Sequence, residues 1–261
     1  MNRAALITVA YACCAALPSH AGSCEVASGP RTAALVELYT SEGCSSCPPA
    51  DRELQHLRHS AGVDAVVIPL GLHVGYWDQI GWKDVFAQKP FEARQALLVA
   101  MGRSGGFVYT PQFFVGGKEL RTWRNALPDA IRKINARAAQ ASITLKWTEG
   151  PGRTVVLEAS GAGQEGNNDS ALYVAISESQ LVSHVLRGEN SNTMLTHDDT
   201  VRDWSGPAKL LHGHAQLQRQ FTAPDDWKLQ HLRAVAFVQD MRTGAVLQAV
   251  STASCYQGKG S

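Results

Sequence analysis

The sequence predicts an α/β domain, with its elements in the order β-α-β, helical insert, β-hairpin and α, followed by a small all-β domain of the sandwich type. Residues 33–60 show the pattern of a buried strand, a loop and a helix. Residues 63–72 (VDAVVIPLGL) form a continuous apolar strand, which is typical of a parallel sheet covered on both faces. After residue 141 the chain changes to short alternating runs separated by turn-rich segments, which is typical of a sandwich.

The first part contains six predicted elements. In chain order they are a strand at 33–40, a helix at 48–60, a strand at 63–72, a helix opened by Pro90, a hairpin at 109–120 and a helix at 127–139. Leu54 and Leu57 share one face of the first helix. Gly116 and Gly117 supply the hairpin turn, and Pro128 suits the first turn of the last helix.

The N-terminus predicts a secretory signal over residues 1–21. Arg3 supplies a positive region, the apolar stretch 4–17 is too short to span a bilayer, and small residues surround a cleavage point near Ala21. We therefore expect a periplasmic or secreted protein, divided into residues 1–21, 22–140 and 141–261. No other segment is long and apolar enough to predict a membrane span.

Charge gives no sign of a nucleic-acid partner. The formal net charge is +1, 18% of residues are charged, and basic residues do not form long runs. The 261 residues, 44% of them hydrophobic, are enough for one large domain or two ordinary ones.

Four cysteines follow the predicted signal, and four cysteines allow three pairings. We predict a disulfide between Cys44 and Cys47 and a structural disulfide between Cys24 and Cys255. The second pair would join the two ends of the mature chain, which commonly lie close together at the surface.

Cys44 and Cys47 stand between a predicted strand and the start of a helix. Free backbone N–H groups and the helix dipole favour an anion at such a place, and a thiolate is an anion. In this setting the pKa of a thiol can fall from about 8.5 into a range of about 3.5–7.5. We therefore predict that Cys44 is an exposed nucleophile and that Cys47, more deeply placed, resolves the mixed disulfide.

The region 33–140 resembles the thioredoxin superfamily in three features: CSSC at a strand-to-helix junction, Thr110-Pro111 before a strand, and Glu37 on the first strand. The resemblance implies a cis bond before Pro111, substrate binding at Thr110 and proton acceptance by Glu37. Gly43 stands where that family has tryptophan. The insertion at 73–105 is longer than in a minimal member.

Nearly the whole mature chain is similar to a family of exported thioredoxin-like proteins known as a domain of unknown function, DUF1223. The shared segments are GCSSCPPAD, HVGYWDQIGWKDVF at 73–86 and a TPQ segment, with Gly75 and Val85 as departures from the usual Asp and Pro. This similarity names a family without naming a reaction.

Several polar residues allow a functional and a structural interpretation. His73 follows the second strand, so it could be a proton donor, substrate contact or metal ligand; packing of its ring on Trp77 or Trp82 is the alternative that we favour. Asp78 and Asp84 are expected to cap helices. Four further residues fit no zinc spacing and are expected in surface loops: His184, His197, Asp198 and Asp199.

Three functions are open. We favour an exported thiol:disulfide oxidoreductase, with Cys44, Cys47, Glu37 and Pro111 as catalytic residues and with Thr110, His73 and Trp77 contacting the client. Its partners would be client protein thiols or disulfides and an unidentified redox partner, with no cofactor and no bound metal. The alternatives are a protein that handles copper or another metal through both thiolates and His73, and a non-catalytic binding module with a structural disulfide.

Overall fold

The structure, a computed structural model, describes residues 22–60, 65–102, 106–163 and 169–255. The predicted signal, residues 1–21, lies outside the described residues. Within the described part, no helix is long and apolar enough to cross a membrane.

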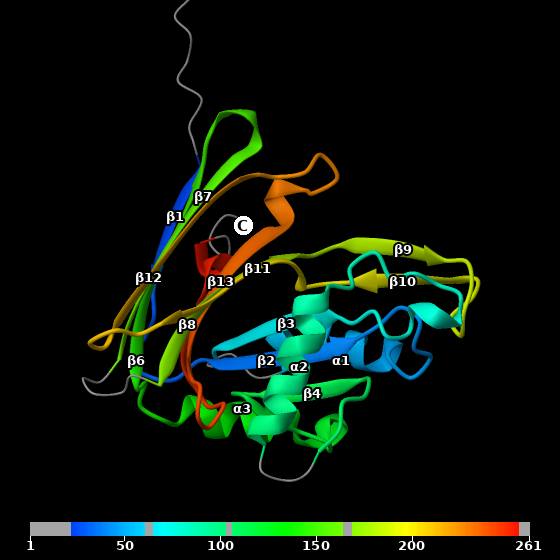
Figure 1. Cartoon of the computed structure of the whole chain (residues 1–261), viewed down its shortest axis with the longest axis horizontal. Coiled ribbons are helices and arrows are strands. Elements are labelled where there is room, and N and C mark those ends of the chain that lie inside the picture. Colours follow the sequence, from blue (N-terminus) through cyan, green and yellow to red (C-terminus); the bar gives the residue numbers. More distant parts are fainter. Residues whose placement is uncertain (1–21, 61–64, 103–105, 164–168, 256–261) are drawn as a thin grey trace, which may run out of the picture.

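An eight-stranded mixed sheet runs through the molecule (Figure 1). Its strands, in spatial order, are β14 (Val246–Ser251), β13 (Leu232–Asp240), β8 (Ser170–Glu178), β11 (Thr200–Lys209), β3 (Val67–His73), β2 (Ala34–Thr40), β4 (Gln112–Val115) and β5 (Lys118–Glu119). The β2–β3 and β3–β11 pairs are parallel, and the other pairs are antiparallel.

A second, four-stranded antiparallel sheet packs on part of the first. It contains, in spatial order, β1 (Ser23–Ala27), β6 (Ala141–Glu149), β7 (Thr154–Gly163) and β12 (His214–Thr222). A separate hairpin of β9 (Leu181–Val185) and β10 (Thr193–His197) projects away from both sheets toward the start of α1 (Pro48–Ser60), as Figure 1 shows.

The predicted fold class is wrong. An α/β domain followed by a separate small sandwich requires two independent sheets, whereas β8, β11, β13 and β14 continue the sheet that β2 and β3 begin. The two parts join where Thr200 of β11 pairs with Gly71 of β3, and Gly71 N–H donates to the Asp199 carbonyl over 2.8 Å. Hydrophobic alternation predicts which residues form strands, but it does not say which strand covers the open edge of β3. The chain division at residue 140 stays a prediction.

Three apolar clusters cover the two faces of the large sheet. On one face, α2 (Lys89–Met101) packs through Phe91 and Leu98 on side chains from both parts of the chain. On the opposite face, the four-stranded sheet covers β8, β13 and β14, while α1 and α3 (Trp123–Asn135) cover β2 and β4. The helix α3 begins four residues earlier than predicted, so that Pro128 lies inside it.

Glu37 and Arg94 form a buried ion pair between β2 and α2. Arg94 Nε and Nη2 lie 2.6 and 3.0 Å from the two carboxylate oxygens of Glu37, and the side chains are 4% and 0% exposed. Glu37 shares this face of the sheet with Tyr39, which donates its hydroxyl to the same carboxylate. The first turn of α1 packs on the other face. The structure therefore does not bring Glu37 to the cysteines, contrary to the proton-accepting role that we predicted for it.

Arg94 also connects α2 to the later strands. Its Nη1 donates to Gln239 of β13 over 3.1 Å. Its guanidinium carbon lies 4.8–5.0 Å from three aromatic ring centroids, those of Tyr173, Trp204 and Phe237. A guanidinium can bind a carboxylate in its plane while its faces contact aromatic rings. Arg94 therefore holds one helix against β2, β8, β11 and β13.

Replacing Arg94 with methionine should lower the free energy of unfolding by about 3–5 kcal/mol, because Glu37 would be left as an unpaired buried carboxylate. The matched control is Arg121→Met, since Arg121 pairs with Glu119 but is 56% exposed and its loss should cost about 1 kcal/mol or less. Urea unfolding measures both variants. Adding Glu37→Gln to Arg94→Met should restore part of the loss. Equal losses of unfolding free energy in Arg94→Met and Arg121→Met would show that the buried pair contributes no more to stability than the exposed one.

Candidate functional site

The Cys44–Cys47 disulfide lies where β2 leads into α1. The Cα atoms of the two cysteines are 5.4 Å apart. The Cys47 carbonyl accepts the N–H groups of Ala50 and Asp51 at 2.8 and 3.0 Å, so the helix begins directly after the disulfide. Pro48 and Pro49 occupy the first helical positions, where no N–H is required.

The second disulfide joins Cys24 of β1 to Cys255, with the Cα atoms 6.1 Å apart. The disulfide-bond prediction is therefore confirmed for both pairs. This bond connects the four-stranded sheet to the segment that follows β14, and it lies among the apolar residues packed between the two sheets. Two disulfides are consistent with an exported protein.

Cys44 and Cys47 are both fully buried, so the prediction of an exposed Cys44 is wrong. The two serines between them, Ser45 and Ser46, are exposed. A segment far away in the sequence, the tip of the β9–β10 hairpin (residues 186–192), lies against this loop.

Two side chains of the tip hold the loop. Asn190 is 8% exposed, and its Nδ2 donates to the carbonyl oxygens of Glu42 and Cys44 at 2.8 and 3.0 Å. Ser45 N–H donates to Glu189 Oε2 over 2.9 Å. Hydrogen bonding from Ser45 lowers the pKa of Glu189, which is in the exposed part of the tip. Sequence reasoning missed both residues, because no local pattern relates positions about 145 apart in the chain.

The backbone donors around Cys44 are largely engaged. The N–H groups of Cys44 and Cys47 donate to the carbonyls of Ser41 and Cys44, each over 3.1 Å. The two prolines have no N–H. The N–H of Ser45, the residue after Cys44, is bound to the Glu189 carboxylate. Ser46 Oγ lies 3.3 Å from Cys44 Sγ, so its hydroxyl can donate to that sulfur.

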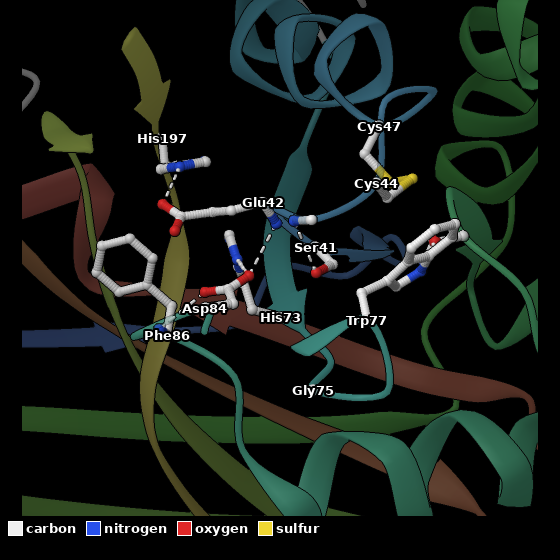
Figure 2. Close-up of polar contacts among 12 residues, drawn as sticks. Ser41, Glu42, Cys44, Cys47, His73, Gly75, Trp77, Asp84, Phe86 and His197 are labelled. Carbon is white, nitrogen blue, oxygen red and sulfur yellow. Dashed lines mark hydrogen bonds and ion pairs between the residues drawn. A yellow bond between two sulfur atoms is a disulfide. The ribbon is translucent and has the colours of Figure 1, made fainter. Parts of the chain in front are cut away.

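The segment around Pro111 is connected to the cysteine loop through Trp77. The Thr110–Pro111 bond is cis, and Trp77 Nε1 donates to Thr110 Oγ1 over 2.7 Å. Figure 2 shows the Trp77 indole beside the disulfide. A side chain at Gly43 would meet Trp77 Cβ at 3.0 Å, so a larger residue at 43 would push Trp77 away by a few tenths of an ångström.

Gln95 of α2 positions the residues on both sides of Thr110 and Pro111. Its Nε2 donates to the Tyr109 carbonyl and to Gln112 Oε1, both over 2.8 Å. Gln95 directly follows Arg94 in the sequence, so the helix held by the buried ion pair also holds this segment.

Beneath the cysteine loop lies an acid–histidine cluster made of Glu42, His73, Asp84 and His197 (Figure 2). His73 Nδ1 lies 2.7 Å from Asp84 Oδ2, and His197 Nε2 lies 3.1 Å from Glu42 Oε1. Their ring centroids are 4.9 Å apart, and all four residues are nearly fully buried.

Two predictions about this cluster are wrong. His197 was expected in a surface loop, but it is 3% exposed and paired with Glu42. Asp84 was expected to cap a helix, but it binds His73 and accepts the N–H groups of Glu42 and Phe86. His73 contacts Asp84, His197 and Phe86 and is 1% exposed. The structure therefore does not place His73 where a client could touch it.

Each His–Asp partner shifts the pKa of the other. Burial works to raise the pKa of Asp84, but the charge and hydrogen bond of His73 outweigh it and hold that pKa below its usual value. Burial works to lower the pKa of His73, whereas Asp84, with smaller effects from Asp51 and Glu42, raises it. Asp51 follows Cys47 by one helical turn, and burial raises its pKa.

The described residues contain no group of three or more His, Cys, Asp or Glu side chains arranged to hold a metal ion. His73, which the copper hypothesis requires as a ligand beside two thiolates, has Asp84 on its Nδ1 instead.

Asp84→Asn should cost about 3 kcal/mol of the free energy of unfolding near pH 5.5, because charged His73 would lose its buried partner. The pKa of His73 is raised in the folded state. The stability that this shift provides is present below pH about 6.5 and is lost as pH rises through the folded-state pKa of His73. The stability from the lowered Asp84 pKa is present above pH about 4 and is lost as pH falls. The penalty of the substitution should therefore be smaller at pH about 9 than near pH 5.5, because the stability that the ion pair provides through His73 is lost as pH rises.

Urea unfolding at the two pH values measures this change. Asp129→Asn, which removes the exposed ion pair with Arg132, is the control and should change little at either pH. A penalty that is independent of pH would mean that His73 and Asp84 are not an ion pair.

Comparisons with known proteins identify relatives by fold and by family. A protein of Agrobacterium tumefaciens, AGR_C_4864, has a crystal structure with TM-score 0.57 and 23% identity, over 85% of this chain and 94% of that chain. HBP35 of Porphyromonas gingivalis gives TM-score 0.61 and 17% identity, over 86% of this chain and 76% of that chain. At these identities the likeness shows the fold alone. No curated protein matches.

The sequence model described as "Protein of unknown function (DUF1223)" matches residues 35–239. This match includes the two-cysteine loop, the acid–histidine cluster and the tip of the β9–β10 hairpin. Since it spans well over half of the chain, the protein belongs to the DUF1223 family.

Proposed function

We propose that the protein catalyses thiol:disulfide exchange with client proteins in an oxidising compartment, through Cys44 and Cys47. The observation that carries this proposal is the closed disulfide between two cysteines three positions apart at the start of a helix, beneath two exposed serines. The second disulfide, Cys24–Cys255, supports the placement of this exchange reaction outside the cytosol.

In the reducing direction, the Cys44 thiolate attacks one sulfur of a client disulfide, and the other client sulfur leaves as a thiolate. Cys47, once deprotonated, attacks Cys44 Sγ in this mixed disulfide. The Cys44–Cys47 bond forms, the second client thiolate leaves, and two electrons have passed to the client. In the oxidising direction the same steps run in reverse, with a client thiolate attacking Cys44 and Cys47 leaving.

Three features near the disulfide support these steps. The Ser46 hydroxyl, 3.3 Å from Cys44 Sγ, can donate to the thiolate. Thr110 and Pro111 are half-buried and Phe107 and Val108 are exposed, so this segment offers a client both backbone and apolar surface. Trp77 connects this segment to the cysteine loop. We retain Pro111 as the residue that docks the client together with Thr110, and Trp77 as a client contact. We assign neither a proton-accepting role to Glu37 nor a client contact to His73.

A second function is favoured by one observation, the complete burial of both sulfurs. A disulfide that no client reaches would stiffen the loop of a binding module. Structural disulfides have potentials below about −300 mV, whereas exchanging ones have higher potentials. The potential of Cys44–Cys47 therefore separates the two functions.

The exchange function is tested with the mature chain in three forms: wild type, Cys44→Ser and Cys47→Ser. Wild type should accelerate the reduction of insulin by dithiothreitol or the refolding of a scrambled disulfide protein, and Cys44→Ser should abolish the effect. Cys47→Ser should retain clients as mixed disulfides on Cys44, visible as adducts that a reductant releases.

The Cys24→Ser/Cys255→Ser double variant controls for loss of a disulfide as such and should keep its exchange activity. Absence of exchange by wild type, together with a potential below about −300 mV, would establish the stiffening role instead.

A further inference from the structure

The tip of the β9–β10 hairpin brings a carboxylate to the two-cysteine loop. Glu189 Oε2 accepts the N–H of Ser45 over 2.9 Å, and Ser45 directly follows Cys44. Asn190 holds the tip in place through its bonds to the Glu42 and Cys44 carbonyls. A further bond, from Gln55 Nε2 of α1 to the Thr196 carbonyl of β10, holds the base of the hairpin over 2.6 Å.

This contact matters differently to the two redox states. The disulfide carries no charge, so the Glu189 carboxylate next to it is tolerated. When the bond is reduced, a Cys44 thiolate needs hydrogen-bond donors, and like charges close together disfavour each other. Glu189 both occupies the Ser45 N–H and brings a negative charge to the residue that directly follows Cys44.

Other acids near the same loop have partners of their own. Glu42 and Asp84 are each paired with a histidine. Asp51 is a further buried acid near the same loop. Glu189 differs from these acids because it is exposed, it comes from a remote hairpin and it accepts the N–H of Ser45, the residue next to Cys44.

We propose that Glu189 is a positioning residue that tunes the redox centre: through Ser45 it disfavours the Cys44 thiolate and so stabilises the Cys44–Cys47 disulfide against reduction. The inference deepens the proposed function, since it assigns a residue that sets how strongly this disulfide oxidises a client. A disulfide whose reduced form is less stable is a weaker oxidant.

The decisive variant is Glu189→Gln. The glutamine amide oxygen can still accept the Ser45 N–H, so the variant removes the charge and keeps the hydrogen bond. The disulfide is equilibrated with glutathione, in which two glutathione thiols become glutathione disulfide as Cys44 and Cys47 gain two electrons and two protons. The equilibrium is read by alkylating the free thiols at pH about 8.5, where thiolate is populated.

We expect the equilibrium constant for reduction to rise about threefold in Glu189→Gln, the size typical of one exposed charge interaction. This corresponds to a potential higher by about 14 mV. The pKa of the Cys44 thiol, followed by the ultraviolet absorbance of the thiolate, should fall in the same variant, and the difference from wild type should shrink at high salt. A merely structural contact would move neither the thiol pKa nor its salt dependence.

Glu25→Gln is the matched control, because it removes one exposed carboxylate from β1, far from the loop (Figure 1). A wild-type equilibrium in Glu189→Gln, or an equal change in Glu25→Gln, would overturn the inference. The glutathione equilibrium needs no client protein. Failure of this inference therefore leaves exchange activity intact, whereas failure of the proposed function would appear as absent client exchange at any potential.

Discussion

The buried ion pair between Glu37 and Arg94 is the interaction on which the rest of the structure depends. Taking both charges out of water is costly, and the cost is offset because the guanidinium also bonds Gln239 and lies against three aromatic rings. These partners come from β2, β8, β11 and β13, so a single side chain joins strands from both halves of the chain. The two parts of the large sheet meet at β3 and β11, which pair through one residue of each strand. Arg94 contacts strands on both sides of this junction.

The helix α2, which carries Arg94, also contacts the candidate site. Gln95 follows Arg94 and fixes the backbone on both sides of Thr110 and Pro111, while Trp77 bonds Thr110 and lies beside the disulfide. At the tip of the β9–β10 hairpin, Glu189 and Asn190 bond to the backbone of the cysteine loop. The disulfide is therefore held between a segment from the first half of the chain and a hairpin from the second. Within this arrangement the sulfurs are buried and the serines between them are exposed.

The acid–histidine cluster connects the β9–β10 hairpin to the cysteine loop. Glu42 belongs to the cysteine loop and His197 to the hairpin, so the Glu42–His197 pair holds the hairpin against the loop. Asn190 at the tip of the hairpin adds a second contact with the loop. His73 and Asp84 extend the cluster, and Asp84 accepts the Glu42 N–H as well. Buried charges in such a network are tolerated because each has a partner and hydrogen bonds. The cluster is consequently a structural support for the loop, and none of its imidazoles reaches solvent.

The sequence by itself determined the local features. The helix α1 covers the same residues that the Leu54 and Leu57 periodicity predicts, and the two cysteines stand where a strand turns into it. Both disulfide pairings and the strand character of the later chain also follow from residue types and spacing. These features depend on contacts within a few residues, or on there being few cysteines to pair.

The tertiary structure alone decided which strands share a sheet, which acid serves which partner, and whether the sulfurs are exposed. The position of Glu37 in the chain predicted a proton acceptor. In the structure, Glu37 instead binds Arg94, 57 residues away, on the face of β2 opposite to α1. His197 fitted a surface loop, yet a hairpin folds it against Glu42, 155 residues away. Periodicity specifies which face of an element is apolar. It carries no information about which distant charge or strand edge will lie against that face, because that depends on how the whole chain packs.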